Sequence, residues 1–181
     1  MAENDPQTAV ADQGDEMADG YRAAAHRIEL EIGEPLGRVL DLGCNTGAGM
    51  EALSGRWWRV QMFGLEPSAA LAQKARDRGF MVAANKAEDM VFPDGYFDLV
   101  FSRHSLEHVA DRTKAIDEIR RVLYPGGRLY VQAPIEPGGS PNALHVSPFV
   151  SLEEFRASFP GFRELYWGPQ ETVAELILEK L

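Results

Sequence analysis

Residues 39–49 read V-L-D-L-G-C-N-T-G-A-G, and Glu66 follows at the end of the next apolar run. The first four residues predict a buried strand, and the glycines after them predict a turn whose backbone can pass close to a ligand. A carboxylate at the tip of the neighbouring strand can accept hydrogen bonds from both hydroxyls of a ribose. Open α/β sheets bind ligands at the carboxyl ends of their strands. These residues therefore predict a site for a nucleoside.

The spacing of the glycines argues against two common nucleotide sites. A dinucleotide site needs the pattern G-x-G-x-x-G, but counting from Gly43 puts Asn45 and Ala48 at the second and third glycine positions. A nicotinamide oxidoreductase is disfavoured for this reason. A Walker-type phosphate loop ends in Gly-Lys-Ser/Thr, and residues 39–55 contain no Lys or Arg. The loop thus offers backbone amides without a cation, which suits a ligand without phosphates.

The composition indicates a soluble globular protein. A chain of 181 residues suits one domain with a sizeable core, and 45% of its residues are apolar and 25% charged. No run approaches the roughly 18–20 consecutive apolar residues of a membrane span, and the amino terminus lacks the basic start and apolar core of a secretory signal. The single cysteine, Cys44, excludes an internal disulfide and fits a reducing compartment, so we expect a cytoplasmic protein.

The charge disfavours nucleic acid as a partner. The formal net charge is −10, whereas nucleic-acid binding normally needs a basic face that neutralises phosphates. Two short basic clusters, Arg76 with Arg78 and Arg120 with Arg121, lie on predicted helices. We interpret both as solvated helix faces.

Periodicity divides the chain into a tail, a helix and an alternating region. Residues 1–15 are acidic and poor in large apolar side chains, which predicts a disordered tail. Residues 16–33 carry apolar side chains at helical spacing and predict an amphipathic helix. Strand and helix patterns then alternate, which predicts a parallel sheet. The predicted strands are 39–42, 60–65, 81–84, 97–102, 128–133, 162–167 and 173–179, and the predicted helices are 46–53, 68–79, 111–123 and 152–159.

The motif D-L-G-C-N-T-G, followed by G-L-E-P-S, resembles the class I methyltransferases that use S-adenosylmethionine. The resemblance extends over about residues 38–181. It implies a Rossmann-like α/β fold: a seven-stranded, mostly parallel sheet with helices on both faces, whose last two strands form a hairpin. The last two predicted strands are only ~5 residues apart, as a hairpin requires. We therefore expect a single methyltransferase-like domain over residues 16–181, with its core over residues 38–181.

The resemblance also implies roles for residues of the first two strand ends. Asp41 and Gly43 would hold the methionine part of the cofactor, and Gly47 would allow its close approach. Glu66 would bind both ribose hydroxyls, and Pro67 would pack on the adenine. Cys44 lies among these cofactor-binding positions, and we interpret it as a small buried filler of the turn, not a nucleophile.

Residues 84–100, A-N-K-A-E-D-M-V-F-P-D-G-Y-F-D-L-V, resemble the stretch in which family members place an acid beside the amine of adenine. The usual acidic position holds Lys86, which cannot accept a hydrogen bond from an amine. We expect Ala87 and Glu88 to contact the adenine in its place. The alternative, that Glu88 and Asp89 are solvated loop acids, stays open.

A histidine motif follows the fourth predicted strand. Ser102 and Arg103 lie nearest the expected sulfonium and are predicted cofactor contacts. Residues 104–108 read H-S-L-E-H, an inverted zinc-protease signature to which His145 could add a third ligand. The motif lies at a strand end within an α/β pattern, so we expect no metal. Glu107 and His108 are then structural or line the pocket for methyl transfer.

The segment 135–148 contains three prolines and two glycines and is the longest irregular stretch after the tail. Loops of this length in compact domains often act as lids. His145 within it is a candidate general base, with His108 as a second catalytic candidate. The alternative for His145 is a hydrogen bond that anchors the loop.

The function expected from these features is methyl transfer from S-adenosylmethionine to a small-molecule acceptor by in-line displacement. Such a reaction needs mainly alignment and exclusion of water, which agrees with the lack of a catalytic triad in the sequence. The alternative is a methyltransferase-like module that binds the cofactor and acts through a partner. The acceptor atom and the oligomeric state have no signature in the sequence.

Overall fold

A computed structural model describes residues 14–181, with side chains described from residue 18 onward. The first helix, α1, spans Gly14–Ile32 and agrees with the helix predicted over residues 16–33. The disordered tail predicted over residues 1–15 lies outside the described residues, apart from the first two positions of α1.

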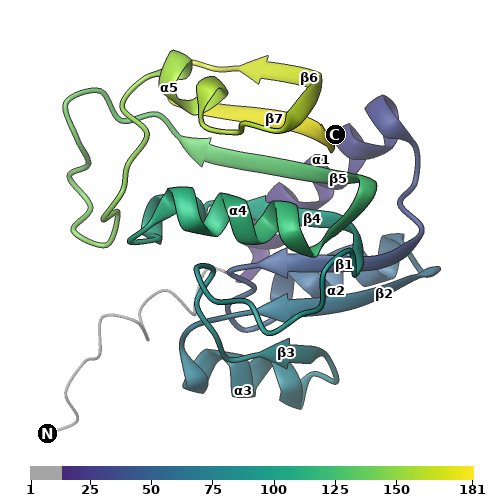
Figure 1. Ribbon diagram of the computed structural model, residues 1–181. Helices are drawn as coiled ribbons and strands as arrows, with labels where there is room; N and C mark the ends of the chain where they lie inside the picture. The colour runs from purple at the N-terminus through teal and green to yellow at the C-terminus, as the bar shows by residue number, and fades with distance from the viewer. Residues whose placement is uncertain (1–13) are drawn as a thin grey trace, which may run out of the picture.

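A single seven-stranded sheet forms the centre of the described chain, in the order β3-β2-β1-β4-β5-β7-β6 (Figure 1). Strand β7 is antiparallel to both of its neighbours, and the remaining pairs are parallel. This arrangement confirms the predicted Rossmann-like fold with a carboxyl-terminal hairpin. The strands are β1 Gly37–Leu42, β2 Val60–Leu65, β3 Met81–Ala83, β4 Phe97–Arg103, β5 Leu123–Pro134, β6 Phe162–Pro169 and β7 Val173–Lys180.

Alternate side chains of the central strands enter two separate apolar layers, because successive residues of a strand point to opposite faces. In β4, Val100 packs in one layer, whereas Leu99 and Phe101 pack in the other. The first layer is covered by buried residues of α4 and α5, and the second by those of α1, α2 and α3. These helices span α2 Ala48–Arg56, α3 Ala69–Asp77, α4 Arg112–Val122 and α5 Leu152–Ala157.

Two helices begin where the sequence predicts. The Ser68 hydroxyl accepts a hydrogen bond from the Leu71 amide at the start of α3, and the Asp111 carboxylate accepts one from the Lys114 amide at the start of α4. Such caps satisfy amides that have no partner within the helix. Helix α2 begins later than predicted, because Gly47, just before it, adopts a left-handed conformation with φ of 81°.

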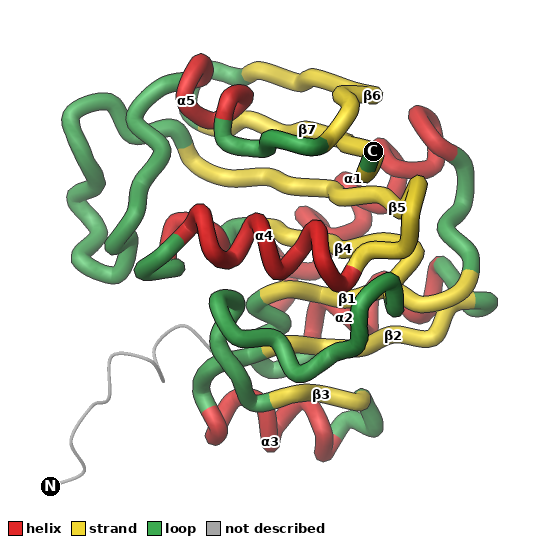
Figure 2. Tube along the Cα trace, viewed as in Figure 1, coloured by secondary structure: helices red, strands yellow, loops and turns green. Residues whose placement is uncertain are grey.

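The carboxyl ends of β1, β2, β4 and β5 lie at one edge of the sheet, on the left in Figure 1. The long segment between β5 and α5 runs over the same side and is drawn as one extended loop in Figure 2. Residues 135–151 are called the lid loop below. The fold thus brings the glycine turn after β1, the end of β2 and the lid loop to one edge.

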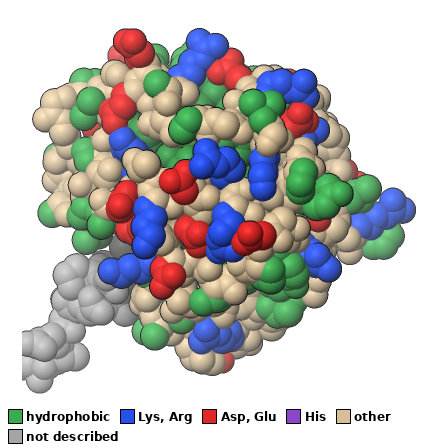
Figure 3. Space-filling view, viewed as in Figure 1, with side chains coloured by type: hydrophobic (Ala, Val, Ile, Leu, Met, Phe, Trp, Pro, Cys, Tyr) green, Lys and Arg blue, Asp and Glu red, His purple; other side chains and the backbone are tan. Residues whose placement is uncertain are grey.

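Three of the four arginines of the two basic clusters form ion pairs within the chain, and the fourth, Arg76, donates to the Val82 carbonyl. Arg120 pairs with Asp117, Arg121 pairs with Asp94 and Glu118, and Arg78 pairs with Glu51. On the face shown in Figure 3, Lys and Arg side chains are interspersed with Asp and Glu. Within residues 14–181, no helix combines the length and the apolar character that crossing a bilayer requires.

Candidate functional site

Glu66 provides the most defined polar group at this edge of the sheet. Its side chain is buried, with 7% of the residue exposed. One carboxylate oxygen accepts a hydrogen bond from the Asn45 amide at 3.0 Å, and the other accepts one from the Ser68 amide at 2.9 Å. Burial raises the pKa of the Glu66 carboxyl, against these two hydrogen bonds, which lower it. Each oxygen retains a lone pair, so the carboxylate is held in place and can still accept two further hydrogen bonds.

The turn after β1 is fixed by its own hydrogen bonds. The amides of Gly43 and Cys44 both donate to the Leu65 carbonyl, at 2.8 and 3.1 Å. The Thr46 amide donates to the Asn45 side chain, and the Gly47 amide donates to the Cys44 carbonyl. The expectation that this loop offers backbone amides to a ligand is therefore wrong for these positions, because their amides already have acceptors in the protein. What the turn offers is close approach of its backbone.

Gly43 shows why this approach needs glycine. Its φ is 77°, and a Cβ atom at this position would overlap the Ser105 hydroxyl. That hydroxyl in turn donates to the Leu42 carbonyl at 2.7 Å. The Cys44 thiol is buried and lies against Gly64, where any Cβ atom would meet it. Burial raises the pKa of this thiol far above its usual range, as expected for a packing residue rather than a nucleophile.

Asp41 is fully buried at the end of β1 and meets a residue of α1 that the sequence argument did not select. The Tyr21 hydroxyl lies 3.3 Å from each Asp41 carboxylate oxygen. Burial raises the pKa of Asp41 to about 7, with the Tyr21 hydrogen bond opposing the shift. The Tyr21 ring stacks on Phe101 with a centroid distance of 5.0 Å, and Gly49 leaves room for it, since a Cβ atom there would overlap the ring.

The end of β4 carries two polar groups without partners. The Ser102 hydroxyl and the Nε atom of Arg103 are buried and have no hydrogen-bond partner in the described part of the chain. The Arg103 guanidinium carbon lies 5.8 Å from the centre of the Tyr21 ring, and a Cβ atom on Gly20 would overlap the guanidinium. Arg103 thus faces α1 and Tyr21, and Ser102, as its neighbour in the strand, faces the other layer.

The two predicted adenine contacts, Ala87 and Glu88, differ in burial and in hydrogen bonding. Ala87 is buried in the layer beneath α4 and α5. One Glu88 oxygen accepts hydrogen bonds from the amides of Ala110 and Asp111, at 3.1 and 3.2 Å, so this acid anchors the segment before α4. Lys86 is exposed, as is Pro67 beside Glu66. A contact of Ala87 and Glu88 with adenine stays a prediction.

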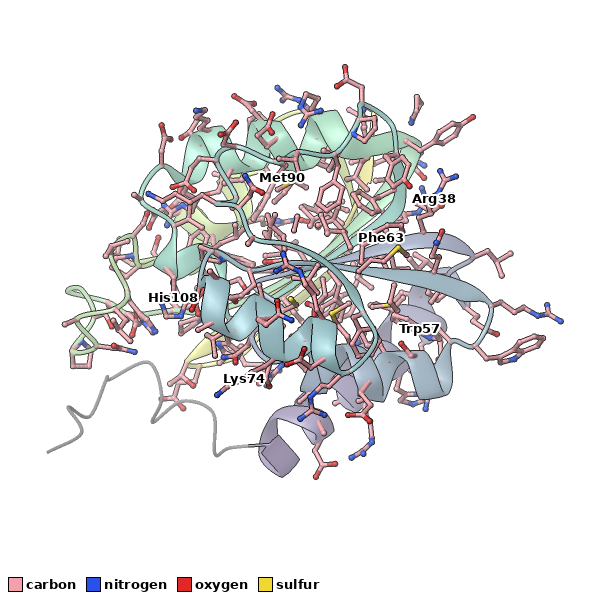
Figure 4. The ribbon with its side chains drawn as sticks, turned by 90° about the horizontal axis from the view of Figure 1, so that it is seen from below. Arg38, Trp57, Phe63, Lys74, Met90 and His108 are labelled. Atoms are coloured by element: carbon pink, nitrogen blue, oxygen red, sulfur yellow. The ribbon has the colours of Figure 1, made fainter. Side chains whose placement is uncertain are left out.

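The two predicted catalytic histidines lie together. His108 ends the short 3-10 helix η2, Leu106–His108, and its ring centre lies 4.8 Å from that of His145 in the lid loop. Figure 4 shows His108 beside the lid loop, on the opposite side of the molecule from Arg38 at the start of β1. Burial raises the pKa of Glu66, and among the opposing influences is His108, which therefore lies within electrostatic reach of this carboxylate.

His145 is anchored by groups within its own loop. Its Nδ1 atom lies 2.8 Å from a Glu136 carboxylate oxygen and 3.0 Å from the Ser140 hydroxyl. Sequence reasoning missed Glu136, although an acid nine residues before a histidine in one loop could have drawn attention to it. One ligand atom of each of Glu107, His108 and His145 lies within 4.8 Å of the others, so these residues could also hold a metal ion.

The comparisons with known proteins agree with this geometry. Residues 40–131 match the family model described as "Methyltransferase domain". The chain is 30% identical over 152 residues to trans-aconitate 2-methyltransferase of Deinococcus radiodurans, covering 83% of this chain and 58% of that protein. It is 36% identical over 139 residues to the ubiquinone/menaquinone biosynthesis C-methyltransferase UbiE of Vibrio campbellii, covering 68% of this chain and 53% of that protein.

Solved structures share the fold. A putative methyltransferase in complex with the Trm112 activator of Haloferax volcanii superposes with a TM-score of 0.77 at 19% identity, covering 99% of both chains. Phosphoethanolamine N-methyltransferase 2 of Haemonchus contortus, solved with S-adenosyl-L-methionine, gives a TM-score of 0.67 at 22% identity and covers 78% of this chain and 36% of that one. The present chain spans little more than half of the length of the two curated relatives named above.

The residues at the strand ends fit the cofactor that the family implies. The buried Glu66 carboxylate has two free lone pairs for a ribose, the Gly43 backbone leaves space that a side chain would fill, and Arg103 carries an unpaired donor. S-adenosylmethionine is the cofactor that this family uses, and these residues could hold it. The chain belongs to the methyltransferase-domain family.

Proposed function

We propose that this chain transfers a methyl group from S-adenosylmethionine to a small organic acceptor by in-line displacement. When bound, S-adenosylmethionine supplies a methyl carbon that is already activated by a positively charged sulfur. The observation that carries the proposal is Glu66, a buried carboxylate fixed by two backbone amides beside a turn without cations. A fixed carboxylate is suited to a ribose diol, because it pays no side-chain ordering cost on binding.

The other cofactor-facing residues have complementary charges. Asp41, with Tyr21 beside it, would accept hydrogen bonds from the ammonium of the amino-acid arm. Arg103 has a buried Nε atom without a partner among the described residues and would donate to the carboxylate of that arm. The space between these charges and the ribose would be lined by Ser102, Gly43, Cys44 and Gly47. This pairing of charges suits a zwitterionic amino-acid arm.

The acceptor would enter on the side of the lid loop. His108 and His145 lie there, and their imidazoles would favour loss of a proton from the acceptor as its lone pair forms the new bond to carbon. Covering of the strand ends by α1 and the lid loop would exclude water from the reacting atoms. The two named relatives, a trans-aconitate 2-methyltransferase and a C-methyltransferase of ubiquinone/menaquinone biosynthesis, support a small acceptor. The single buried cysteine suits a reducing compartment such as the cytoplasm.

Calorimetric titration with S-adenosylhomocysteine tests the cofactor site. We expect binding to the wild-type chain and a loss of affinity of about 10-fold or more in Glu66→Gln, because a hydrogen bond to a charged group contributes roughly 1.5–3 kcal/mol. Glu171→Gln is the matched control, since Glu171 is an exposed acid of the β6–β7 turn. Equal affinity in wild type and Glu66→Gln, with both proteins folded, would contradict the proposal.

Turnover separates an enzyme from a binding module that transfers nothing. The assay measures release of S-adenosylhomocysteine with a panel of unsaturated organic acids, phenols and quinols, chosen after the relatives. Sustained release with one acceptor class ends the module hypothesis. Tight cofactor binding without turnover on any class of the panel would favour it.

A further inference from the structure

Three side chains from two distant segments converge beside the strand ends. Glu107 and His108 belong to η2, and His145 belongs to the lid loop. One ligand atom of each residue lies within 4.8 Å of those of the other two. Carboxylate and imidazole groups in this combination are common ligands of divalent transition metals.

Glu107 gives the strongest sign that something is bound. It is fully buried, with 0% of the residue exposed, and neither carboxylate oxygen has a hydrogen-bond partner in the described chain. The Nδ1 atom of His104 lies 3.5 Å from one oxygen, beyond a well-formed hydrogen bond. Buried carboxylates are normally hydrogen-bonded, paired or bound to a metal, because desolvation without compensation is costly. Glu107 therefore lacks a partner that the fold would be expected to provide.

Both histidines have an acceptor beside Nδ1. The Nδ1 atom of His108 lies 3.0 Å from the Leu144 carbonyl, which can only accept, so Nδ1 carries the proton. The Nδ1 atom of His145 faces the Glu136 carboxylate at 2.8 Å. In each ring, Nε2 is then left with its lone pair available. A metal-bound histidine almost always donates its other N–H to a carbonyl or a carboxylate, as these two do.

We propose that Glu107, His108 and His145 bind a divalent transition-metal ion, with Zn²⁺ as the first candidate. Two imidazoles and one carboxylate form a ligand set of the kind that catalytic zinc sites use, with at least one coordination position left open. Ligands at about 2.0–2.1 Å from zinc lie roughly 3.3 Å apart in a tetrahedral site, so the three side chains would draw together slightly. Ca²⁺ and Mg²⁺ prefer sites built of oxygen ligands and are not expected to compete.

This ligand set differs from the inverted zinc-protease signature. That motif would use His104 and His108 on one helix, whereas here η2 is a single 3-10 turn. His104 lies outside the turn, with a positive φ of 50°. The two histidines that meet are His108 and His145, 37 positions apart in the chain. His145 is the third ligand considered from the sequence, whereas Glu107 takes the place that the motif gives to His104.

The ion would connect η2 to the lid loop. It would hold His145 against the turn after β4 and leave an open position on the side where the acceptor is placed. An acceptor oxygen bound there would lose its proton more readily, because a metal lowers the pKa of a bound hydroxyl. With the ion in place, the two histidines would act through the metal and not as free bases. This last role rests on the proposed function, whereas binding of the ion does not.

The test is titration of the full chain, stripped of metal, with Zn²⁺ by calorimetry and with Co²⁺ by visible absorption. Neither cofactor nor acceptor is added, so failure here is distinct from failure of the proposed function. We expect one ion per chain, a d–d absorption band from a low-symmetry cobalt site, and no competition from a large excess of Mg²⁺.

Substitutions identify the ligands. His145→Gln, His108→Gln and Glu107→Gln should each weaken Zn²⁺ binding by about 100-fold or more, and Glu136→Gln by about 10-fold, as loss of an outer partner does. His26→Gln is the matched control, since His26 is an exposed residue of α1. Because Glu107→Gln changes a buried group, its circular dichroism spectrum is compared with that of wild type. His145→Gln, in the loop, keeps the test valid if Glu107→Gln fails to fold.

The outcomes are decisive in both directions. Loss of the cobalt band in His145→Gln and its retention in His26→Gln would support the site. Zinc binding that survives in both His145→Gln and His108→Gln would come from another part of the surface and would overturn the proposal. Binding that requires His104 but not His145 would also overturn it, in favour of the inverted motif.

Discussion

The two sides of the site are built in different ways. On the cofactor side, the amides of residues 43–47 all have acceptors at the ends of β1 and β2, and Glu66 accepts from the amides of Asn45 and Ser68. On the lid side, His145 pairs with side chains of its own loop, and the Glu107 carboxylate has no hydrogen-bond partner within residues 14–181. The first side is therefore determined by strand pairing, and the second by where a long loop places single residues. Mutations should affect stability and cofactor affinity on the first side, and turnover on the second.

The largest effect is expected from Asp41→Asn, which should change how the free energy of unfolding depends on pH. The pKa of Asp41 is raised from 3.8 to about 7 by burial. A raised pKa in an acid means that the folded state favours the protonated form, so this contribution is present below pH 4 and is lost as the pH rises through 7. The unfolding free energy of Asp41→Asn, relative to wild type, should therefore increase between pH 4 and pH 8 by on the order of 4 kcal/mol.

Urea denaturation of both proteins across this pH range measures the difference. A difference that stays constant with pH would show that Asp41 is ionised without cost. Water would then reach the Asp41 carboxylate to a greater extent than its burial indicates.

The next largest effect is expected from Gly43→Ala. The new methyl group would overlap the Ser105 hydroxyl at a positive φ, which should cost about 2–3 kcal/mol of stability. Gly139→Ala in the lid loop is the matched control, because Gly139 also has a positive φ, of 95°, but nothing lies within 4 Å of its Cβ position. Midpoints of chemical denaturation compare the two. Equal losses would mean that strain alone, and not the contact with Ser105, determines the cost.

His145→Gln should separate turnover from cofactor binding. We expect its affinity for S-adenosylhomocysteine to stay within about threefold of wild type, while turnover falls by at least about 10-fold, since acid–base groups typically contribute more than that. Calorimetry and an acceptor assay on the same preparation measure both quantities. A parallel loss of cofactor affinity would mean that the lid loop also shapes the cofactor side.

The smallest effect is expected from Tyr21→Phe. The change removes the hydroxyl that lies between the two Asp41 oxygens and leaves the stacked ring in place. The loss should be about 1 kcal/mol of stability at pH 8, where Asp41 is ionised, and less at pH 4. Thermal denaturation at the two pH values checks this. A larger loss at pH 4 than at pH 8 would contradict the assigned hydrogen bond.

The fold could be predicted from the sequence because its signals are local and repeated. Alternating strands and helices, the caps at Ser68 and Asp111, and the short separation of the last two strands are each read within a few residues. Glu66 could be predicted as part of the site for a similar reason, since strand order alone brings it beside the glycine turn.

The rest of the site depends on contacts between distant residues. Nothing in the apolar pattern of α1 indicates that Tyr21 would reach Asp41, or that Gly49 would leave room for its ring. The backbone geometry of the glycine turn determines that its amides bond to acceptors within the protein. The rotamer of Glu88 determines that its carboxylate bonds to the backbone amides of residues 110–111. A linear pattern contains neither kind of information.

The Gly43 and Cys44 amides both donate hydrogen bonds to the Leu65 carbonyl, and these two hydrogen bonds hold the turn against its neighbouring strand. The backbone of the turn is therefore preorganised, and binding of a ligand there would cost little conformational entropy. A rigid turn offers the same shape to the charged methyl donor and to its neutral by-product, so within the turn the two differ for the protein mainly in charge. The acids and the arginine around the strand ends set the local electric field, so exchange of spent for fresh cofactor is a question of charge and not of reshaping the turn.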